Sequence, residues 1–102
     1  MSAITTHVLD TAQGRPAAGV PLLLERTDGD GWLRVGGGAT DADGRARLGD
    51  AAPGHHRLTF ETSGWSGFYP QVVVHFTVAA GEDHYHVPLL LRPYGYSTYR
   101  GS

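Results

Sequence analysis

Histidine is the residue type with the clearest chemical potential in this sequence, with six imidazoles among 102 residues. His84 and His86 are two residues apart, so on a β-strand both imidazoles would lie on one face. An imidazole with a pKa of about 6.5 can accept or donate a proton at neutral pH, which suits general acid–base catalysis. Together with His7, the pair could instead form a three-histidine zinc site. A third interpretation is that these are partly exposed polar positions on a sheet.

The remaining histidines give weaker signals. His55 and His56 adjoin a loop and are expected on the solvent-facing surface, and His75 lies opposite the valine face of its strand, where it is expected to be structural or exposed.

Eight arginines, no lysine and ten acidic residues give a net charge of -2, and the sequence lacks the clustered basic charge that nucleic-acid binding requires. The absence of cysteine excludes disulfides, thiolate zinc sites and cysteine nucleophiles.

The last ten residues have an unusual composition for a chain terminus. Residues 93–102 contain three tyrosines, one arginine and two serines. Termini usually fray and carry small, flexible residues, whereas tyrosine and arginine are enriched where surfaces are buried between partners. The tail is therefore expected to be ordered, either at a subunit interface, in a ligand pocket or as a buried C-terminal strand.

The elements that must position these residues are predicted to be strands. Fifteen glycines and six prolines are too many turn-forming residues for a helix bundle, and no segment of ten residues has a helical period. Strands are expected at residues 4–9, 20–26, 32–35, 45–48, 55–61, 71–78, 85–91 and 97–100. Residues 36–38 are expected to break the chain, and residues 62–69 to connect two strands. The pattern predicts an all-β fold, a sandwich of two antiparallel sheets with seven to eight strands.

Length and hydropathy limit how the chain is organised. A chain of 102 residues fits one domain, here residues 1–102, with one modest core. Its apolar runs are much shorter than the roughly 20 residues needed to cross a bilayer, so no membrane association is expected. The first residues have neither the basic nor the apolar region of a secretory signal, so we expect a cytoplasmic location.

Four segments of the sequence resemble the 5-hydroxyisourate hydrolases of the transthyretin-related family. They are THVLDTAQGRPA at 6–17, TDADGR at 40–45, HYHVPLLL at 84–91 and YGYSTYRGS at 94–102. The ending Tyr-Arg-Gly-Ser is the most specific of these motifs and is absent from transthyretin, a hormone carrier. The resemblance implies a transthyretin-like (prealbumin-like) sandwich and a cyclic amide hydrolase that acts on 5-hydroxyisourate in urate degradation.

The resemblance also implies a set of site residues. The catalytic positions of the family fall on His7, Arg45, His86 and Ser102. Tyr99 and Arg100 are expected to contribute to substrate binding, because the tail would line a pocket shared between chains. The family implies a homotetramer, a dimer of dimers with active sites where the dimers meet. The only other partner it implies is the small-molecule substrate, with no metal and no cofactor.

Two alternatives and two departures remain at this stage. A transthyretin-like carrier would use the same channel without turnover, and an adhesion or carbohydrate-binding module would share the sandwich alone. The family usually has serine where this chain has Arg92, and residues 61–67 are several residues too few for the short helix of the family. The four matched catalytic positions are unaffected by either departure.

Overall fold

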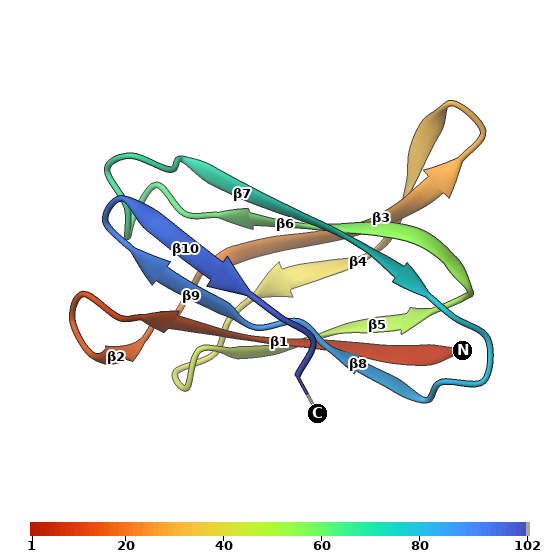
Figure 1. Ribbon diagram of the computed structural model, residues 1–102, viewed down its shortest axis with the longest axis horizontal. Helices are drawn as coiled ribbons and strands as arrows, with labels where there is room; N and C mark the ends of the chain where they lie inside the picture. The colour runs from red at the N-terminus through yellow and green to blue at the C-terminus, as the bar shows by residue number, and fades with distance from the viewer. Residues whose placement is uncertain (102) are drawn as a thin grey trace.

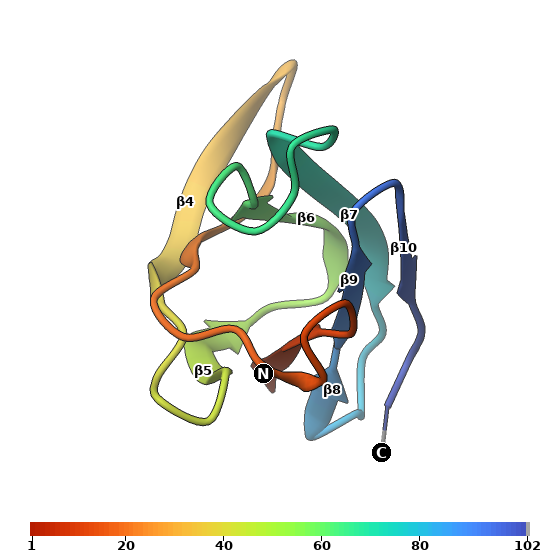
Figure 2. The ribbon, with the colours of Figure 1, turned by 90° about the vertical axis from the view of Figure 1, so that its left-hand side faces the viewer.

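The computed structural model describes residues 1–101, which form ten β-strands and no α-helix. The strands are β1 (Ser2–Asp10), β2 (Arg15–Pro16), β3 (Pro21–Asp28), β4 (Gly31–Ala39), β5 (Arg45–Ala51), β6 (Gly54–Glu61), β7 (Gln71–Val78), β8 (His84–His86), β9 (Leu89–Arg92) and β10 (Gly95–Thr98). They stack in two layers (Figures 1 and 2). The predicted all-β sandwich is confirmed. Nothing in this part of the chain is a helix that could span a bilayer.

The two sheets differ in how their strands pair. One sheet has the order β4-β3-β6-β7 and is antiparallel throughout. The other is built around β1, which pairs antiparallel with β2 and β5 and parallel with β8 and β9, while β10 pairs antiparallel with β9. The parallel pairing brings His84 and His86 alongside the N-terminal strand. Figure 1 shows β8 next to β1.

Strict alternation along β1 separates the core from an outer face. Ile4 and Val8 are fully buried between the sheets, whereas Thr5 and His7 point away from the core and are partly exposed. Burying an aliphatic side chain of this size contributes roughly 1.5–3 kcal/mol. A one-residue slip would move the aliphatic residues outward and the polar ones inward, so burial fixes which side chains β1 presents to solvent.

The predicted break at residues 36–38 is wrong, because these glycines lie inside β4. A Cβ atom built on Gly36 would lie only 1.6 Å from the carbonyl oxygen of Leu48 in β5. Gly36 therefore permits a close approach between the two sheets, and the three glycines do not end the strand. The predicted strand at 85–91 is in fact two strands, β8 and β9, interrupted at Val87 and Pro88, where proline has no N–H to donate. The last predicted strand, at 97–100, lies instead at Gly95–Thr98.

The short helix of the family is absent from residues 62–69. A single turn replaces it, in which the carbonyl of Thr62 accepts hydrogen bonds from the N–H groups of Trp65 and Ser66, both at 2.9 Å. The Ser66 hydroxyl then donates to the carbonyl of Pro93 at 2.9 Å and ties this connector to the β9–β10 turn. The shortened segment thus closes one end of the sandwich without a helix.

One histidine prediction is also wrong. His55 and His75 are exposed as expected, but His56 is fully buried. Because β6 already begins at Gly54, alternation turns His56 inward, where its ring stacks on Phe76 with centroids 5.9 Å apart. The ring forms one hydrogen bond, from Nδ1 to the carbonyl of Gly54 at 3.0 Å.

Candidate active site

The outer face of β1 and its two neighbours gathers most of the residues singled out by sequence. In the register of β1 with β5, His7 lies opposite Arg45 and Thr5 opposite Arg47. In the register of β1 with β8, Thr5 lies opposite His86. These strands form the wall of an open depression of about 370 Å³. Its lining includes Thr5, Asp41, Arg45, Arg47, His84 and His86.

A tight turn before β5 fixes the position of Arg45. Oδ1 of Asp41 accepts hydrogen bonds from the backbone N–H groups of Asp43 and Arg45, both at 2.9 Å. Gly44 has a φ of 75°, and a Cβ there would lie 2.4 Å from the carbonyl oxygen of Val8. Only glycine adopts that backbone angle readily and tolerates such an approach. The Asp-Gly turn thus anchors the start of β5 against β1.

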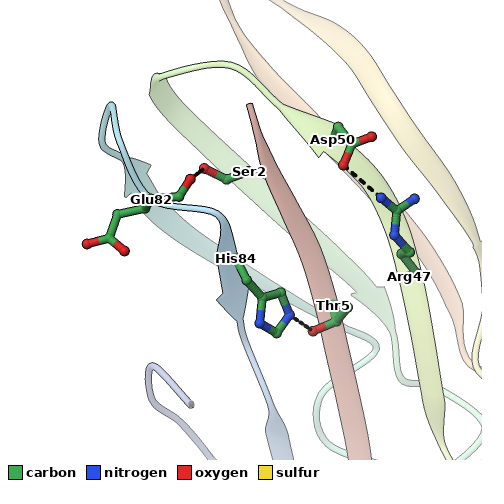
Figure 3. A network of polar contacts seen from close by, with 6 residues as sticks. All are labelled: Ser2, Thr5, Arg47, Asp50, Glu82 and His84. Atoms are coloured by element: carbon green, nitrogen blue, oxygen red, sulfur yellow. Dashed lines mark hydrogen bonds and ion pairs between the residues drawn. The ribbon is translucent and has the colours of Figure 1, made fainter.

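Arg45 and Arg47 share one face of β5 but differ in their contacts. Arg47 donates to Asp50 at 2.7 Å, an exposed ion pair seen in Figure 3. Within residues 1–101, no carboxylate lies at ion-pair distance from the Arg45 guanidinium. Arg45 therefore keeps its planar set of N–H donors for a ligand in the depression, where a carbonyl or urea edge could accept two of them.

His7 is oriented by the same turn that positions Arg45. Its Nε2 lies 2.9 Å from the carbonyl oxygen of Asp43, which can only accept a hydrogen bond. Nε2 therefore carries a hydrogen, and in the neutral ring Nδ1 is the nitrogen with a lone pair. His7 thus lies beside Arg45 with one nitrogen occupied by the backbone and the other able to contact a ligand.

His86 is the histidine of this face with a perturbed pKa. Burial lowers the pKa of His86 below its ordinary value of about 6.5, and positive charge on His84, Arg45 and His7 lowers it further. The ring is therefore neutral at pH 7. A neutral imidazole is the form that can accept a proton from water. The N–H of Gly101 donates to the carbonyl of His86 at 2.8 Å, so the chain end runs alongside this histidine.

The predicted tail residues are placed differently. Ser102 lies outside the described residues. Tyr99 and Arg100 line a separate cavity of about 260 Å³ between β7 and the edge of the other sheet. The Arg100 guanidinium stacks on the ring of Tyr85 at 4.3 Å and lies 3.5 Å from the carboxylate of Glu82. The chain therefore brings His7, Arg45 and His86 together, but not Tyr99 and Arg100.

Thr5 belongs to this face although sequence reasoning did not name it, and His84, which was named there together with His86, lies beside it. Thr5 Oγ1 lies 2.7 Å from Nε2 of His84, a contact between β1 and β8 that Figure 3 shows. The alternation that puts His7 on the outer face also puts Thr5 there, and this alternation is the sequence signal that could have identified Thr5.

In the part of the chain that the structure describes, no three histidine, cysteine or acidic side chains form a group that could hold a metal ion.

Comparison with known proteins gives consistent results. The model of the HIUase/Transthyretin family matches residues 4–101. The 5-hydroxyisourate hydrolase of Caulobacter vibrioides is 48% identical, with all of both chains covered. The solved 5-hydroxyisourate hydrolase of Klebsiella pneumoniae is 38% identical, with a TM-score of 0.84 and full coverage of both chains. Transthyretin from Sparus aurata has a TM-score of 0.88 at 29% identity, covering 96% of this chain and 95% of its own.

Overall shape does not separate these relatives, since the carrier and the hydrolase structures superpose about equally well. The outer face of this chain is more informative. Around one depression it places two imidazoles, including His86 with its lowered pKa, and the Arg45 guanidinium, which has no carboxylate partner within residues 1–101, so a proton acceptor lies beside a fixed positive charge. That combination suits the addition of water to a carbonyl, because it stabilises both the departing proton and the developing oxyanion.

Proposed function

The chain belongs to the HIUase/Transthyretin family, and we infer from this that it is a 5-hydroxyisourate hydrolase acting in urate degradation. The reaction opens the six-membered ring of 5-hydroxyisourate to give 2-oxo-4-hydroxy-4-carboxy-5-ureidoimidazoline. The observation that carries this function is 48% identity to a hydrolase over the whole of both chains. The transthyretin-like carrier is not favoured, because an apolar ligand needs no cluster of imidazole and guanidinium groups.

We propose that His86 accepts the proton of the attacking water through Nε2. The water oxygen forms a bond to the ring carbonyl carbon, and the negative charge that develops on the carbonyl oxygen is stabilised by Arg45. Collapse of this intermediate breaks the ring C–N bond, and the proton held by His86 passes to the departing nitrogen. His7, fixed by the carbonyl of Asp43, would hold the substrate through Nδ1. No step of this scheme requires a metal or a cofactor.

The tail residues enter this proposal on the family resemblance alone. Ser102 would contact the substrate or the water, and Tyr99 and Arg100 would contribute to substrate binding. These three roles stay predictions, as does a cytoplasmic location.

We also propose that the working form is a homotetramer, a dimer of dimers. Among the described strands, β7 ends one sheet and β10 ends the other, and both edges lie on the same side of the sandwich (Figure 2). Tyr96 and Tyr99 are exposed along this side. Two open edges with exposed tyrosines would extend both sheets in a second copy, which accounts for a dimer, and the pairing of two such dimers rests on the family resemblance. Sedimentation of the protein should give four times the mass of the chain, and a monomer or a dimer would contradict the proposal.

The activity is tested by generating 5-hydroxyisourate from urate and following its ultraviolet decay with and without the protein. The wild type should accelerate the decay. Relative to the wild type, His86→Asn should be slower by about 10²–10⁴-fold, as for the loss of an acid–base group, and His7→Asn by about 10-fold, as for the loss of one hydrogen bond that holds the substrate. Circular dichroism of both variants checks that the sandwich is intact. Decay at the spontaneous rate in the presence of folded wild type would refute the function. Full activity in both variants would remove these histidines from the mechanism.

A further inference from the structure

The hydroxyl of Thr5 lies between two imidazoles. Its Oγ1 is 2.7 Å from Nε2 of His84 and 2.9 Å from Nδ1 of His86. The parallel register of β1 and β8 creates this arrangement, because it places Ala3 opposite His84 and Thr5 opposite His86, with all these side chains on the outer face. Figure 3 shows Thr5 and His84 facing each other from these two strands. The three side chains form one hydrogen-bonded chain.

The single hydrogen of the hydroxyl couples the two rings. If Thr5 donates to His84, then Nδ1 of His86 must carry a hydrogen and donate to Thr5, which leaves Nε2 of His86 with a lone pair. If Thr5 donates to His86 instead, Nε2 carries the hydrogen and cannot accept a proton in the neutral ring. The direction of one hydroxyl bond thus decides whether His86 can act as a base through Nε2.

The charges around His86 favour the first arrangement. Arg45 on β5 brings a permanent positive charge to the depression that His86 also lines, whereas the carboxylate of Asp41 there is engaged by backbone N–H groups. Thr5 occupies Nδ1 of His86, so Nε2 is the ring nitrogen left for this depression. A guanidinium can only donate, so a lone pair on Nε2 suits it better than an N–H group. The exposed ring of His84 has no such constraint, because water can solvate its Nδ1 in either tautomer.

The orientation of the His86 ring is fixed from a second side. Gly101 lies against it so closely that a Cβ atom there would be 2.6 Å from Cδ2 of His86. The ring is thus held at Nδ1 by Thr5 and at Cδ2 by the backbone of Gly101. A flip of the ring would exchange these two atoms and give up the bond to Thr5. Within residues 1–101, Nε2 of His86 has no hydrogen-bond partner, so this nitrogen is available to a ligand.

We propose that Thr5 and His84 are positioning residues which hold His86 as the tautomer with hydrogen on Nδ1 and the lone pair on Nε2. The chain runs from Nδ1–H of His86 to Thr5 Oγ1, and from the Thr5 hydroxyl to Nε2 of His84. Its consequence for turnover rests on the proposed function, because it matters only if Nε2 of His86 accepts the proton of water. The tautomer itself is a property of the free protein.

The test compares Thr5→Val, which keeps the shape and β-propensity of the side chain but removes the hydroxyl, with Thr5→Ser, which keeps the hydroxyl. Long-range proton–nitrogen correlation spectra of ¹⁵N-labelled protein at pH 7.5 report which nitrogen of each histidine is protonated. His86→Asn identifies the His86 signals. Because Thr5 is only partly buried, both Thr5 variants are expected to fold, and circular dichroism checks this.

In the wild type and in Thr5→Ser, His86 should be protonated at Nδ1, and in Thr5→Val the Nε2–H tautomer should become substantially populated. Turnover should follow, with kcat in Thr5→Val reduced by up to about 10²-fold, KM little changed, and Thr5→Ser close to the wild type. A wild-type His86 protonated at Nε2, or a Thr5→Val variant with unchanged tautomer and kcat, would overturn the inference. The predicted tautomers in a wild type that hydrolyses no 5-hydroxyisourate would refute the proposed function alone.

Discussion

At the level of single residues, Arg45 and Arg47 are two guanidinium groups on one strand face with different tasks. Arg47 is paired with Asp50, while Arg45, next to His7, has no carboxylate partner within residues 1–101. Only the unpaired group can place two parallel N–H donors on a substrate carbonyl or urea edge. The charge alone would therefore not be sufficient for its role.

Arg45→Lys is accordingly expected to lower kcat by about 10²–10³-fold, as for the loss of one donor to a developing oxyanion. The substitution keeps the charge and loses the planar fork. Arg47→Lys is the matched control on the same face and should stay close to the wild type, because an exposed ion pair contributes little. Steady-state kinetics of the two variants side by side decide the matter. Equal rates in both would show that a point charge suffices or that Arg45 lies outside the site.

The buried ring of His56 is expected to make the free energy of unfolding depend on pH. Burial lowers the pKa of His56 in the folded state, positive charge on Arg26 and His55 lowers it further, and the hydrogen bond to Gly54 opposes the shift. The unfolded chain therefore binds the proton more readily than the folded one. The contribution of His56 to the free energy of unfolding is complete above about pH 6.5 and is lost as the pH falls from there through the lower folded-state pKa.

Substituting this side chain should flatten that dependence. His56→Leu removes the titrating group and also a buried Nε2 that has no hydrogen-bond partner among the described residues. Urea unfolding between pH 5 and 8 should give a shallower loss of stability on the acid side for His56→Leu than for the wild type. His75→Leu, which removes an exposed imidazole, should keep the wild-type slope. Equal slopes for His56→Leu and the wild type would contradict this assignment.

At the level of elements, the two sheets approach each other closely where Gly36 of β4 lies against Leu48 of β5. Any side chain at this position in β4 would collide with the carbonyl of Leu48 in β5. Gly36→Ala should lower the free energy of unfolding by about 1–3 kcal/mol, the usual cost of overpacking, or prevent folding. Gly64→Ala is the control, since a Cβ atom at Gly64 meets nothing within 4 Å and its φ is not positive, so it should be neutral or slightly stabilising. Denaturant midpoints that agree within error would refute the close approach.

The strands that sequence predicted best are those whose burial is decided locally. Every second residue of 71–78 is valine or phenylalanine from Val72 to Val78, the residues between them are polar except Val73, and β7 has these same bounds. The glycines at 36–38 were misread as a break because the close approach of Gly36 is to Leu48, on the next strand, which no pattern within residues 36–38 records. The division of residues 85–91 into β8 and β9 had a local signal in Pro88, but the parallel pairing of both pieces with β1 is a long-range feature that no local pattern records.

In the candidate site too, residues in local motifs were predicted, and a residue that depends on a long-range contact was not. His7, Arg45 and His86 were predicted from motifs, and the structure places them around one depression or directly beside it. Thr5 was missed, because its partners come from β8, about 80 residues away, and only the parallel register places its hydroxyl between the two rings. Motif matching finds residues that touch a substrate more readily than residues that orient them.

At the level of the whole molecule, the sandwich supports more than one function. Transthyretin from Sparus aurata and the hydrolase from Klebsiella pneumoniae share its shape. The shared shape therefore does not decide the function, which must be argued from the side chains that this chain places around the depression and from its tail. The tail contacts two sides of the sandwich. Gly101 contacts His86 on the outer face of β1 and β8, while the Arg100 guanidinium lies over the ring of Tyr85 on the side where β7 and β10 form the sheet edges.

Deleting residues 99–102 should therefore affect activity and assembly while leaving the fold. The core residues Ile4, Leu58 and Phe60 are fully buried and lie on β1 and β6, outside the deleted segment, so the deleted chain should keep its β-sheet circular dichroism. Turnover should be abolished, because the backbone that orients His86 and the predicted contact of Ser102 are both removed. The tetramer should weaken, because the exposed Tyr99 is lost from the open side.

Ser102→Ala separates the tail backbone from its last side chain. It should cost about 1 kcal/mol of transition-state stabilisation, the usual value of one hydrogen bond, and leave sedimentation unchanged. The deletion should be much more severe in both measurements, because the hydrogen bond from Gly101 to His86 is lost with it. If the deleted chain turned over substrate at the wild-type rate, the tail would have no part in the active site. If it stayed tetrameric but inactive, the tail would serve the site alone, and the β7 and β10 edges would account for the assembly.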